Sequence, residues 1–535
     1  MSYKVFIPTA GIGSRLKGLS KRVNKSLVDI NGKPTISYIV EKFSKENKFV
    51  VALGYKGEDV KDFLEMTYPE LNFEFVWINP YKGDESGLGL TMIQCKDYLQ
   101  SPFIFCSNDT IVEGEIPEPD HNWAGFSRTA DTSEYRSFRI NNNFITEVCA
   151  KNAEGDVYPY IGLCGIYDYK VFWSSMISSD VSIKVGESYG LQDLISHKVT
   201  GYEFKWFDTG NIDSITKARD SLVNEYEGIN VLPKEEEAIW FCNDKVIKFH
   251  TDQSFISNRV KRAENLYPYT PKIISSSKHL YGYEMIEGQV LSRHPSLDNF
   301  NSFLDWMKGF WIPFDLNRSE ADHFRALCLN FYKDKTLERV TDFLEKFEVH
   351  DAGGLVNGVY VDNAYTLINQ VDWDDLSDGK PCQFHGDLHF ENILINTDNQ
   401  SKFTLLDWRQ DFSGDTDVGD LYYDLAKLNH GFIISHEIIN SENYSFSADF
   451  SGNIEFDFYR KNSLIDCQSV LQGWVLSNQL SWHKVQLLTT LIFLNIAPLH
   501  RYPYSNLLFY LGKSSLQKFL SLNSKETELI DSSTK

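Results

Sequence analysis

Short runs of apolar residues alternate with helical patterns over the first part of the chain. Four of these runs are continuous, as expected for strands covered on both faces: Tyr3 to Pro8, Phe49 to Leu53, Phe73 to Ile78 and Phe103 to Cys106. Between the first two runs, apolar residues from Ile36 to Phe43 have the spacing of one helical face. This order predicts an α/β fold with a doubly wound, mostly parallel sheet, whose ligands bind beyond the carboxyl ends of the strands.

The pattern changes in the segment NEYEGINVLPKEEE, which holds Gly, Pro and a run of acids without periodicity. Such a composition is typical of a domain connection. Strands are predicted again at Ala238 to Phe241 and Lys245 to Phe249, followed by a helix from Phe255 to Leu266 and, later, mostly helical patterns. We therefore expect a first domain at 1–225, a linker at 226–237, a second α+β domain at 238–525 and a frayed tail at 526–535.

Composition narrows the classes of partner. The chain has 535 residues, a hydrophobic fraction of 42% and a formal net charge of −22. That length and apolar content support several folded domains and exclude wholesale disorder. The negative charge is the wrong sign for a protein whose main partner is nucleic acid or an anionic membrane, although small anions can still bind in local basic pockets.

The cysteines and the apolar segments indicate a cytoplasmic protein. The 8 cysteines are scattered without a CxxC pair, which favours buried thiols over zinc or disulfides. The first residues carry no signal-peptide pattern, and the apolar stretch from Leu487 to Leu499 is interrupted by polar residues and Pro498. We expect that stretch to be a core helix, with no membrane insertion. Whether the protein forms a homo-oligomer stays open.

The first candidate site follows the first predicted strand. The segment AGIGSRL, residues 10–16, places two glycines at a strand-to-helix turn, where backbone N–H groups can approach phosphate. The third glycine of a dinucleotide fingerprint and the GK[ST] of a P-loop are both missing. A GxG turn alone is equally typical of simple packing. Other residues must therefore show whether this turn binds phosphate.

The longer stretch PTAGIGSRLKGLSKRVNKSLVDINGKP resembles the opening signature of the sugar-nucleotidyltransferase-like family. The resemblance covers the first domain and implies a GT-A-like fold that transfers NMP from an NTP to a phosphate monoester and releases pyrophosphate. It implies that Ala10, Gly11 and Gly13 bind the nucleotide. It also implies that Arg15 and Lys25 are the catalytic cations.

Other segments match later parts of the same pattern. The positions concerned are Gly87 in ESGLG for the nucleotide, Lys151 in VCAK for the substrate phosphate, and Asp109 in SND and Asp208 in WFDTG for Mg²⁺. Two residues depart from the pattern: Asn24 replaces a proline, and Ala150 replaces an acid. A phosphate monoester is already an anionic nucleophile, so this chemistry needs cations and Mg²⁺ on carboxylates more than a general base.

The second candidate site is the segment HGDLHFENILI at 385–395, followed by FTLLDW at 403–408. Asp387 in a loop, Asn392 five residues later and Asp407 at the end of the next strand match the layout by which kinases orient a hydroxyl and hold Mg²⁺. HGD in place of HRD, and DWR in place of DFG, resemble small-molecule kinases related to aminoglycoside phosphotransferases and choline kinases. That resemblance implies a protein-kinase-like fold.

The kinase resemblance also implies roles for other residues. Asp387 is the catalytic residue that accepts or orients the proton of the acceptor hydroxyl, and Asn392 and Asp407 are the metal ligands. Residues assigned to ATP are Lys248 on a strand, Glu264 as its helix partner, and Glu284 and Met285 in the hinge. We expect His385 and His389 to be hydrogen-bonded loop scaffolding, and Asp424 to support the catalytic loop.

A kinase makes phosphate monoesters and a nucleotidylyltransferase consumes them, so the pair predicts a bifunctional enzyme. The C-terminal domain is expected to phosphorylate a small hydroxylated metabolite with ATP, and the N-terminal domain to convert the product with an NTP, CTP being favoured, into a precursor for surface polysaccharide. The alternatives are a sugar kinase joined to a sugar-1-phosphate nucleotidylyltransferase that uses UTP or dTTP, an antibiotic-modifying kinase with an incidental fusion, and a nucleotide-sensing regulatory protein with one inactive domain. The acceptor, whether amino alcohol, polyol or sugar, stays open.

Overall fold

The computed structural model of the chain describes residues 3–128, 133–223, 236–397 and 402–533, with side chains up to residue 522. It divides into two compact units: unit 1 is Met1–Gln253 with Ile274–Met285, and unit 2 is Ser254–Ile273 with Ile286–Lys535. The expected linker at 226–237 lies almost wholly outside the described residues, so the predicted domain limits stay predictions. Within the described residues, no helix is both long and apolar enough to cross a membrane.

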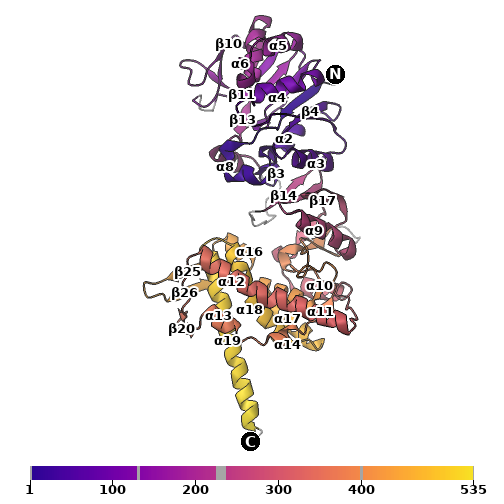
Figure 1. Cartoon of the computed structure of the whole chain (residues 1–535), viewed down its shortest axis with the longest axis vertical. Helices are drawn as coiled ribbons and strands as arrows, with labels where there is room; N and C mark the ends of the chain where they lie inside the picture. The colour runs from indigo at the N-terminus through magenta and orange to yellow at the C-terminus, as the bar shows by residue number, and fades with distance from the viewer. Residues whose placement is uncertain (1–2, 129–132, 224–235, 398–401, 534–535) are drawn as a thin grey trace. The chain divides into compact units, whose positions relative to one another are not determined.

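Unit 1 is built on a nine-stranded sheet with the order β5-β4-β1-β6-β11-β8-β12-β10-β9 (Figure 1). All four strands predicted in the first part of the chain lie in it, within one residue of their expected ends. The strands are β1 (Lys4–Pro8), β4 (Lys48–Leu53), β5 (Asn72–Trp77), β6 (Phe103–Cys106), β8 (Trp123–Phe126), β9 (Ser137–Asn141), β10 (Phe144–Cys149), β11 (Tyr158–Ile166) and β12 (Val199–Glu203).

The prediction of a mostly parallel sheet is correct for only half of it. Strands β5, β4, β1 and β6 pair in parallel, whereas β11 pairs antiparallel with β6 and β8, and β10 pairs antiparallel with β12 and β9. Only β8 and β12 are parallel in the second half. The sheet is therefore mixed, because within the described residues no helix lies between β6 and β11 along the chain, so these strands return without the helical crossovers that parallel neighbours need.

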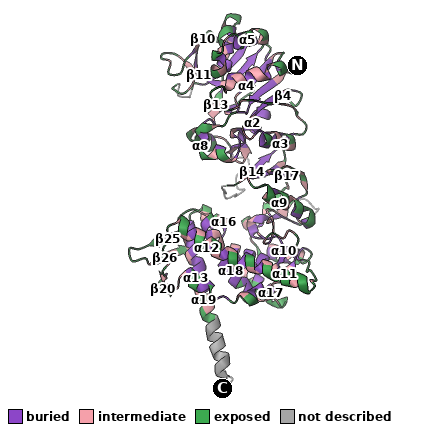
Figure 2. Ribbon diagram, in the orientation of Figure 1, coloured by how far each residue is buried: buried purple, intermediate pink, exposed green. Residues whose placement is uncertain are grey.

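Helices cover both faces of this sheet, as a doubly wound fold requires. Val5 and Ile7 of β1 pack in one core and Phe6 packs in the other, so successive side chains alternate between the two faces. Helices α2 (Thr35–Val40), α3 (Gly57–Thr67) and α8 (Ile212–Ser221) contribute to the first core, and α4 (Leu88–Cys95), α5 (Tyr169–Met176) and α7 (Glu187–Leu194) to the second. Buried residues accordingly concentrate in the strands and exposed ones on the outer helices (Figure 2).

Two smaller groups of strands complete unit 1. Strands β7 (Thr110–Glu113) and β13 (Lys205–Asp208) pair antiparallel in a separate ribbon. Strands β14 (Glu237–Cys242), β15 (Lys245–His250) and β17 (Leu280–Glu284) form antiparallel pairs, and Trp240 and Ile247 belong to the first core. The strands expected at Ala238 and Lys245 are confirmed, although the compact division groups them with unit 1.

Unit 2 combines small sheets with helices, in keeping with the α+β expectation. One sheet holds β18 (Gly288–Val290), β22 (Ile393–Asn396) and β23 (Phe403–Leu405), and another holds β19 (Gly354–Val356), β20 (Val359–Val361), β25 (Tyr444–Ala448) and β26 (Ile454–Phe458). The longer helices are α9 (Gln253–Leu266), α10 (Leu297–Met307), α11 (Arg318–Leu329), α12 (Lys335–Lys346), α15 (Leu421–Ile433), α17 (Asn462–Ser477), α18 (Trp482–Ile496) and α19 (Tyr504–Ser533). Helices α12 and α18 lie side by side (Figure 1), and α18 is the buried helix expected at Leu487. The backbone stays helical to Ser533, where a frayed tail was expected.

Candidate active sites

The first site forms where two strand ends meet. Asp109 follows β6 and precedes β7, and Asp208 is the last residue of β13, in register with Thr110. The backbone N–H of Thr209 donates to the carbonyl oxygen of Asp109 at 2.9 Å. The ribbon of β7 and β13 thus brings together two aspartates that lie far apart in the sequence.

The two carboxylates face a common point beside Gly210. A Cβ atom added at Gly210 would lie 3.0 Å from Asp208 Oδ1 and 3.3 Å from Asp109 Oδ2, so both groups close on the space that this glycine leaves free. The Gly210 N–H also donates to Asp208 Oδ1 at 3.0 Å. Two converging carboxylates fit the oxygen-ligand preference of Mg²⁺, as predicted for these residues.

Lys25 is held against Asp109 by the loop after β1. Its Nζ lies 2.5 Å from Asp109 Oδ2. Gly13 makes the space for it, since Gly13 has φ of 69° and a Cβ there would lie 2.9 Å from the Lys25 Cβ. Asn24, the departure from the family's proline, is buried and donates to the carbonyl oxygens of Thr9 and Tyr55, so it fixes the same loop by hydrogen bonds.

Positive charge keeps Asp109 ionised. Burial by itself raises the pKa of this carboxyl, but Lys25, Ser107 and Arg15 together outweigh burial and lower the pKa to about 2. Arg15 is exposed, Ala10 is buried at the end of the strand, and no atom lies within 4 Å of a Cβ added at Gly11. The loop therefore presents an exposed cation and open backbone next to the carboxylates.

Two predicted residues of the first site, Gly87 and Lys151, form no hydrogen bond or ion pair with Lys25, Asp109 or Asp208 within the described residues. A Cβ at Gly87 would lie 2.3 Å from the carbonyl oxygen of Ile183, so this glycine lets α4 pack against α6 (Val181–Val185). Lys151 is exposed in the turn after β10, and within the described part of the chain no contact joins it to Lys25 or Asp109. Their assigned roles stay predictions.

Sequence reasoning missed two groups near these aspartates. The Tyr135 hydroxyl donates to Asp208 Oδ2 at 2.9 Å, across 73 positions of sequence, and that distance leaves no local signal. Glu187 begins α7 directly after Gly186 and is buried, and its Oε2 has no hydrogen-bond partner within the described residues. Burial raises the pKa of Glu187 to about 7.

The second site is the loop between β21 (Pro381–Cys382) and β22. Asp387 Oδ1 lies 2.6 Å from Lys427 Nζ, which comes from α15, and Asp387 Oδ2 lies 3.8 Å from His389 Nε2. The side chain of Lys427 is 9% exposed and that of Asp387 is 30% exposed. The lysine is therefore buried beneath a carboxylate that still faces outward. Lys427 is a further residue that sequence reasoning missed.

The expected metal ligands of the second site are adjacent. The Leu406 N–H donates to the Asn392 carbonyl oxygen at 2.8 Å, which sets Asp407 beside Asn392, and the Asn392 amide donates to the Asp387 carbonyl oxygen at 2.9 Å. Asp407 adopts φ of 57° and pairs with the guanidinium of Arg259 from α9. An amide oxygen and a carboxylate at neighbouring positions suit Mg²⁺.

Asp424 supports the catalytic loop, as expected. Its carboxylate is fully buried and accepts hydrogen bonds from the backbone N–H groups of His385 at 2.8 Å and Gly386 at 2.7 Å, and from the Trp311 indole at 3.0 Å. Burial raises the pKa of Asp424 to about 6, against these bonds. His385 is also scaffolding, since its Nε2 bonds the Leu406 carbonyl oxygen at 2.9 Å.

The residues assigned to ATP are less clearly placed. Glu264 is exposed on α9, whereas Arg259 and Arg262 of the same helix face inward; Arg262 donates to the carbonyl oxygens of Phe384 and Arg409. Lys248 is buried on β15, and Glu284 and Met285 are exposed at the end of β17. These last three lie in unit 1 and the catalytic loop lies in unit 2, so their roles stay predictions.

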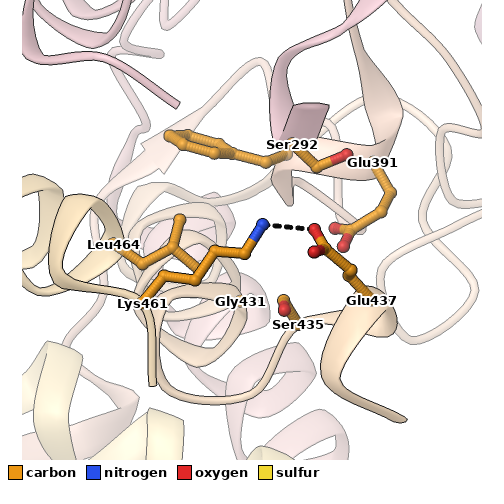
Figure 3. A pocket seen from close by; sticks show the side chains of 8 residues that line it. Ser292, Glu391, Gly431, Ser435, Glu437, Lys461 and Leu464 are labelled. Atoms are coloured by element: carbon orange, nitrogen blue, oxygen red, sulfur yellow. Dashed lines mark hydrogen bonds and ion pairs between the residues drawn. The ribbon is translucent and has the colours of Figure 1, made fainter. Parts of the chain in front are cut away.

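A small pocket lies behind His389. His389 Nδ1 bonds Glu391 at 2.9 Å, and Glu391 lines the pocket together with Ser292, Ser435, Glu437 and Lys461. Figure 3 shows the Lys461 ammonium reaching the Glu437 carboxylate inside it. Burial opposes the charge of His389, but its bonds to Asp387 and Glu391 raise its pKa to about 9. An ion pair therefore lies inside the pocket, and Glu391 connects the lining of the pocket to His389 of the loop.

Comparison with known proteins links each region to transferases. Residues 304–437 match the model of the phosphotransferase enzyme family. "Bifunctional protein GlmU" of Methanococcus vannielii is 24% identical over 239 residues, which are 42% of this chain and 55% of the relative. A UTP--glucose-1-phosphate uridylyltransferase of Staphylococcus haemolyticus is 28% identical over 138 residues, 21% of this chain and 47% of the relative. The chain thus spans about half the length of the curated relatives it matches.

Solved structures give similar matches. The CTP:phosphocholine cytidylyltransferase of Streptococcus pneumoniae aligns with 41% of this chain and 99% of its own, at 17% identity and a TM-score of 0.34. The inositol-1-phosphate CTP transferase of T. maritima aligns with 42% of this chain and 98% of its own, at 16% identity and a TM-score of 0.33. The family match and the sequence relatives together support a fusion in which the N-terminal part is similar to nucleotidyltransferases and residues 304–437 match the phosphotransferase enzyme family.

Proposed function

We propose that this chain is a bifunctional enzyme that makes a phosphate monoester at its C-terminal site and activates that ester with a nucleotide at its N-terminal site. One observation carries the proposal: each region holds an aspartate paired with a lysine beside further oxygen ligands for Mg²⁺. The pairs are Lys25 with Asp109, next to Asp208, and Lys427 with Asp387, next to Asn392 and Asp407.

At the C-terminal site, Asp387 accepts the proton of an acceptor hydroxyl. The hydroxyl oxygen forms a bond to the γ-phosphorus of ATP while the bond from that phosphorus to the β,γ-bridging oxygen breaks, and ADP leaves. Asn392 and Asp407 are the residues that would hold Mg²⁺, which supplies charge neutralisation on the phosphates when bound. Asp424 and His385 keep the loop in place by the hydrogen bonds already described.

At the N-terminal site, an oxygen of the monoester forms a bond to the α-phosphorus of an NTP. The bond from that phosphorus to the α,β-bridging oxygen breaks, and pyrophosphate leaves. Arg15 and Lys25 neutralise the incoming and departing anions, and Asp109 and Asp208 are placed to hold Mg²⁺. A general base is unnecessary because the phosphate monoester is already ionised.

CTP with a non-sugar acceptor is the preferred assignment of substrates. Sugar-binding members of the sugar-nucleotidyltransferase-like family have an Asn-Ala-Gly type of segment where this chain has Tyr160-Ile161-Gly162. This replacement favours an acceptor other than a sugar. The rival is UTP with a sugar 1-phosphate, and the name of the Staphylococcus relative favours it. Either product suits a cytoplasmic step that supplies surface polysaccharide.

The test is pyrophosphate release by the full chain with Mg²⁺. CTP, UTP and dTTP are each combined with phosphocholine, glycerol phosphate and glucose 1-phosphate, and Asp208→Asn is the control. We expect release with CTP and a non-sugar phosphate, and at least a hundredfold loss in the variant. Release with UTP and glucose 1-phosphate alone would establish the rival. No release with any pair would leave a nucleotide-sensing protein as the better account.

A further inference from the structure

A group of three cations lies beside the catalytic loop of the second site. We call Lys335, Arg409 and Lys427 the cationic cluster. Lys335 begins α12, Arg409 follows Asp407-Trp408, and Lys427 comes from α15. All of these residues belong to unit 2.

The ring of Phe331 holds two members of the cluster together. Lys335 Nζ lies 4.2 Å and the Arg409 guanidinium carbon 4.7 Å from the centre of this ring, so the two cations cannot be farther apart than the sum of those distances. Phe331 sits in the π-helical turn Asn330–Asp334 that joins α11 to α12, and Phe412 stacks on it with ring centres 4.4 Å apart. π-turns of this kind are frequent at functional sites.

Arg409 and Lys427 connect the cluster to Asp387. The Arg409 N–H donates to the His385 carbonyl oxygen at 2.9 Å, and a Cβ added at Gly386 would lie 2.6 Å from the Arg409 Cβ. Lys427 Nζ lies 2.6 Å from Asp387 Oδ1. Arg409 and Lys427 therefore adjoin the loop of Asp387, the residue proposed to face the acceptor hydroxyl.

The charges in this cluster do not balance. Within the described residues, neither Lys335 nor Arg409 forms an ion pair with a carboxylate; the guanidinium of Arg409 donates to the backbone carbonyl of Asp411 at 3.0 Å. Burial lowers the pKa of Lys335, and the neighbouring Arg409, Arg339 and Lys427 lower it further, while Asp411 opposes them with a smaller effect. Like charges held close together destabilise one another unless an anion binds between them.

We propose that the acceptor phosphorylated at the second site carries an anionic group, a carboxylate or a phosphate, that binds Lys335 and Arg409 while its hydroxyl lies at Asp387. This proposal rests on the proposed kinase function and narrows the class of acceptor. A cationic amino alcohol would be repelled by Lys335 and Arg409, which form no ion pair with a carboxylate within the described residues, so choline-like acceptors are disfavoured. The transfer is the one already written, with the hydroxyl proton passing to Asp387 and ADP leaving.

The γ-phosphate of ATP has the same chemistry and is the other source of an anion for this cluster. The acceptor is favoured because Arg409 packs against Gly386 and Lys427 binds Asp387, which is the acceptor side of the loop. The predicted Mg²⁺ ligand Asp407 is paired instead with Arg259. The experiment therefore measures the two ligands separately.

The first arm measures binding of inorganic phosphate to the full chain saturated with Mg²⁺ and ADP, by calorimetric titration. The variants are Lys335→Gln, Arg409→Gln and the matched control Lys333→Gln, which removes a lysine two residues from Lys335. We expect at least tenfold weaker phosphate binding in the first two variants, with phosphate affinity in the control and ADP affinity in all three within twofold of the unmodified chain. Unchanged phosphate affinity, or a loss confined to ADP affinity, would overturn the proposal.

The second arm measures ADP formation with three matched acceptors that differ mainly in charge: glycerate, glycerol and 2-amino-1,3-propanediol. We expect the largest kcat/KM with the anionic member, and a selective rise of its KM in Arg409→Gln. Preference for the cationic member would overturn the inference about the acceptor. Absence of ADP binding, with phosphate binding intact, would instead contradict the kinase function itself.

Discussion

The two candidate sites use the same pair of residues in opposite ways. In unit 1, Lys25 and Asp109 are shielded equally, with side chains 15% and 16% exposed. In unit 2, Lys427 is 9% exposed and its partner Asp387 is 30% exposed. An equally shielded pair at the end of an open loop can separate when ligands arrive. A buried lysine beneath a partly exposed aspartate stays in place and directs that aspartate outward.

This difference follows from what each reaction needs. At the first site the nucleophile is already charged, so both partners serve anions: the aspartate through Mg²⁺ and the lysine directly. At the second site the nucleophile is a neutral hydroxyl, so the aspartate must remain available to its proton. The comparison teaches that an Asp–Lys pair alone does not define a role; the burial of each partner does.

The largest expected effect is the loss of one activity while the activity of the other region is retained. Asp387→Asn removes the proton acceptor and should reduce ADP formation by at least a thousandfold, while pyrophosphate release from a supplied phosphate monoester stays within twofold. Asp109→Asn should do the reverse. Both rates are measured on the full chain with saturating Mg²⁺. If either variant lost both activities while remaining folded, the two sites would not be independent.

Substitution of the lysine at each site tests the same difference, with a smaller expected loss of activity. Lys427→Gln should lower kcat for phosphoryl transfer by about 10- to 100-fold with little change in KM, because it positions Asp387 without touching substrate. Lys25→Gln should change both kcat and KM for nucleotidyl transfer. Lys513→Gln is the control, since Lys513 is paired with the buried Asp351 in the same unit as Lys427. A loss of kcat in that control equal to the loss in Lys427→Gln would mean that Lys427 is only structural.

The support beneath the second site is tested by a stability measurement. Asp424→Ala leaves three buried donors without an acceptor and should lower the free energy of unfolding by about 3 kcal/mol or more in urea titrations. Asp420→Ala is a matched control, because Asp420 is also buried and accepts from Lys380 N–H, Tyr422 N–H and the Tyr332 hydroxyl. Similar losses of stability are expected, with phosphoryl transfer abolished only in the first variant. Retained transfer in Asp424→Ala would refute its supporting role.

The smallest effect concerns Glu187 in unit 1. Because burial raises its pKa from 4.5 to about 7, the folded state favours the protonated form, and the stability it contributes is complete below pH 4.5 and lost as pH rises through 7. Glu187→Gln should remove that decline, so that on going from pH 5 to pH 8 the variant loses less stability than the unmodified chain, by on the order of 1–3 kcal/mol. Equal pH dependence in the two proteins, measured by urea unfolding, would contradict this.

The strands and the local motifs could be predicted because their signals are local. Phe103 to Cys106 is a continuous apolar run and corresponds to β6, and HGD with Asn392 lies within one loop. The direction of the later strands could not be predicted, since apolar runs carry no information on whether a neighbour runs parallel. This is why half of the sheet was predicted wrongly.

The supporting groups of both sites escaped prediction for a related reason. Tyr135 meets Asp208 across 73 positions, and Lys427 reaches the loop residue Asp387 from α15, so only the folded chain brings these groups together. Gly87 illustrates the reverse case. The sequence placed it at the nucleotide, and the structure gives it a packing reason, the close approach of α4 to Ile183.

The most direct test of the account is whether pyrophosphate release depends on phosphorylation by the same chain. The full protein is given Mg²⁺, CTP or UTP, and unphosphorylated glycerate, glycerol and glucose, with and without ATP. We predict pyrophosphate only when ATP is present, and none in Asp387→Asn unless a phosphorylated acceptor is added. Pyrophosphate released equally without ATP, or ADP formed without any pyrophosphate following, would contradict the coupling of the two sites.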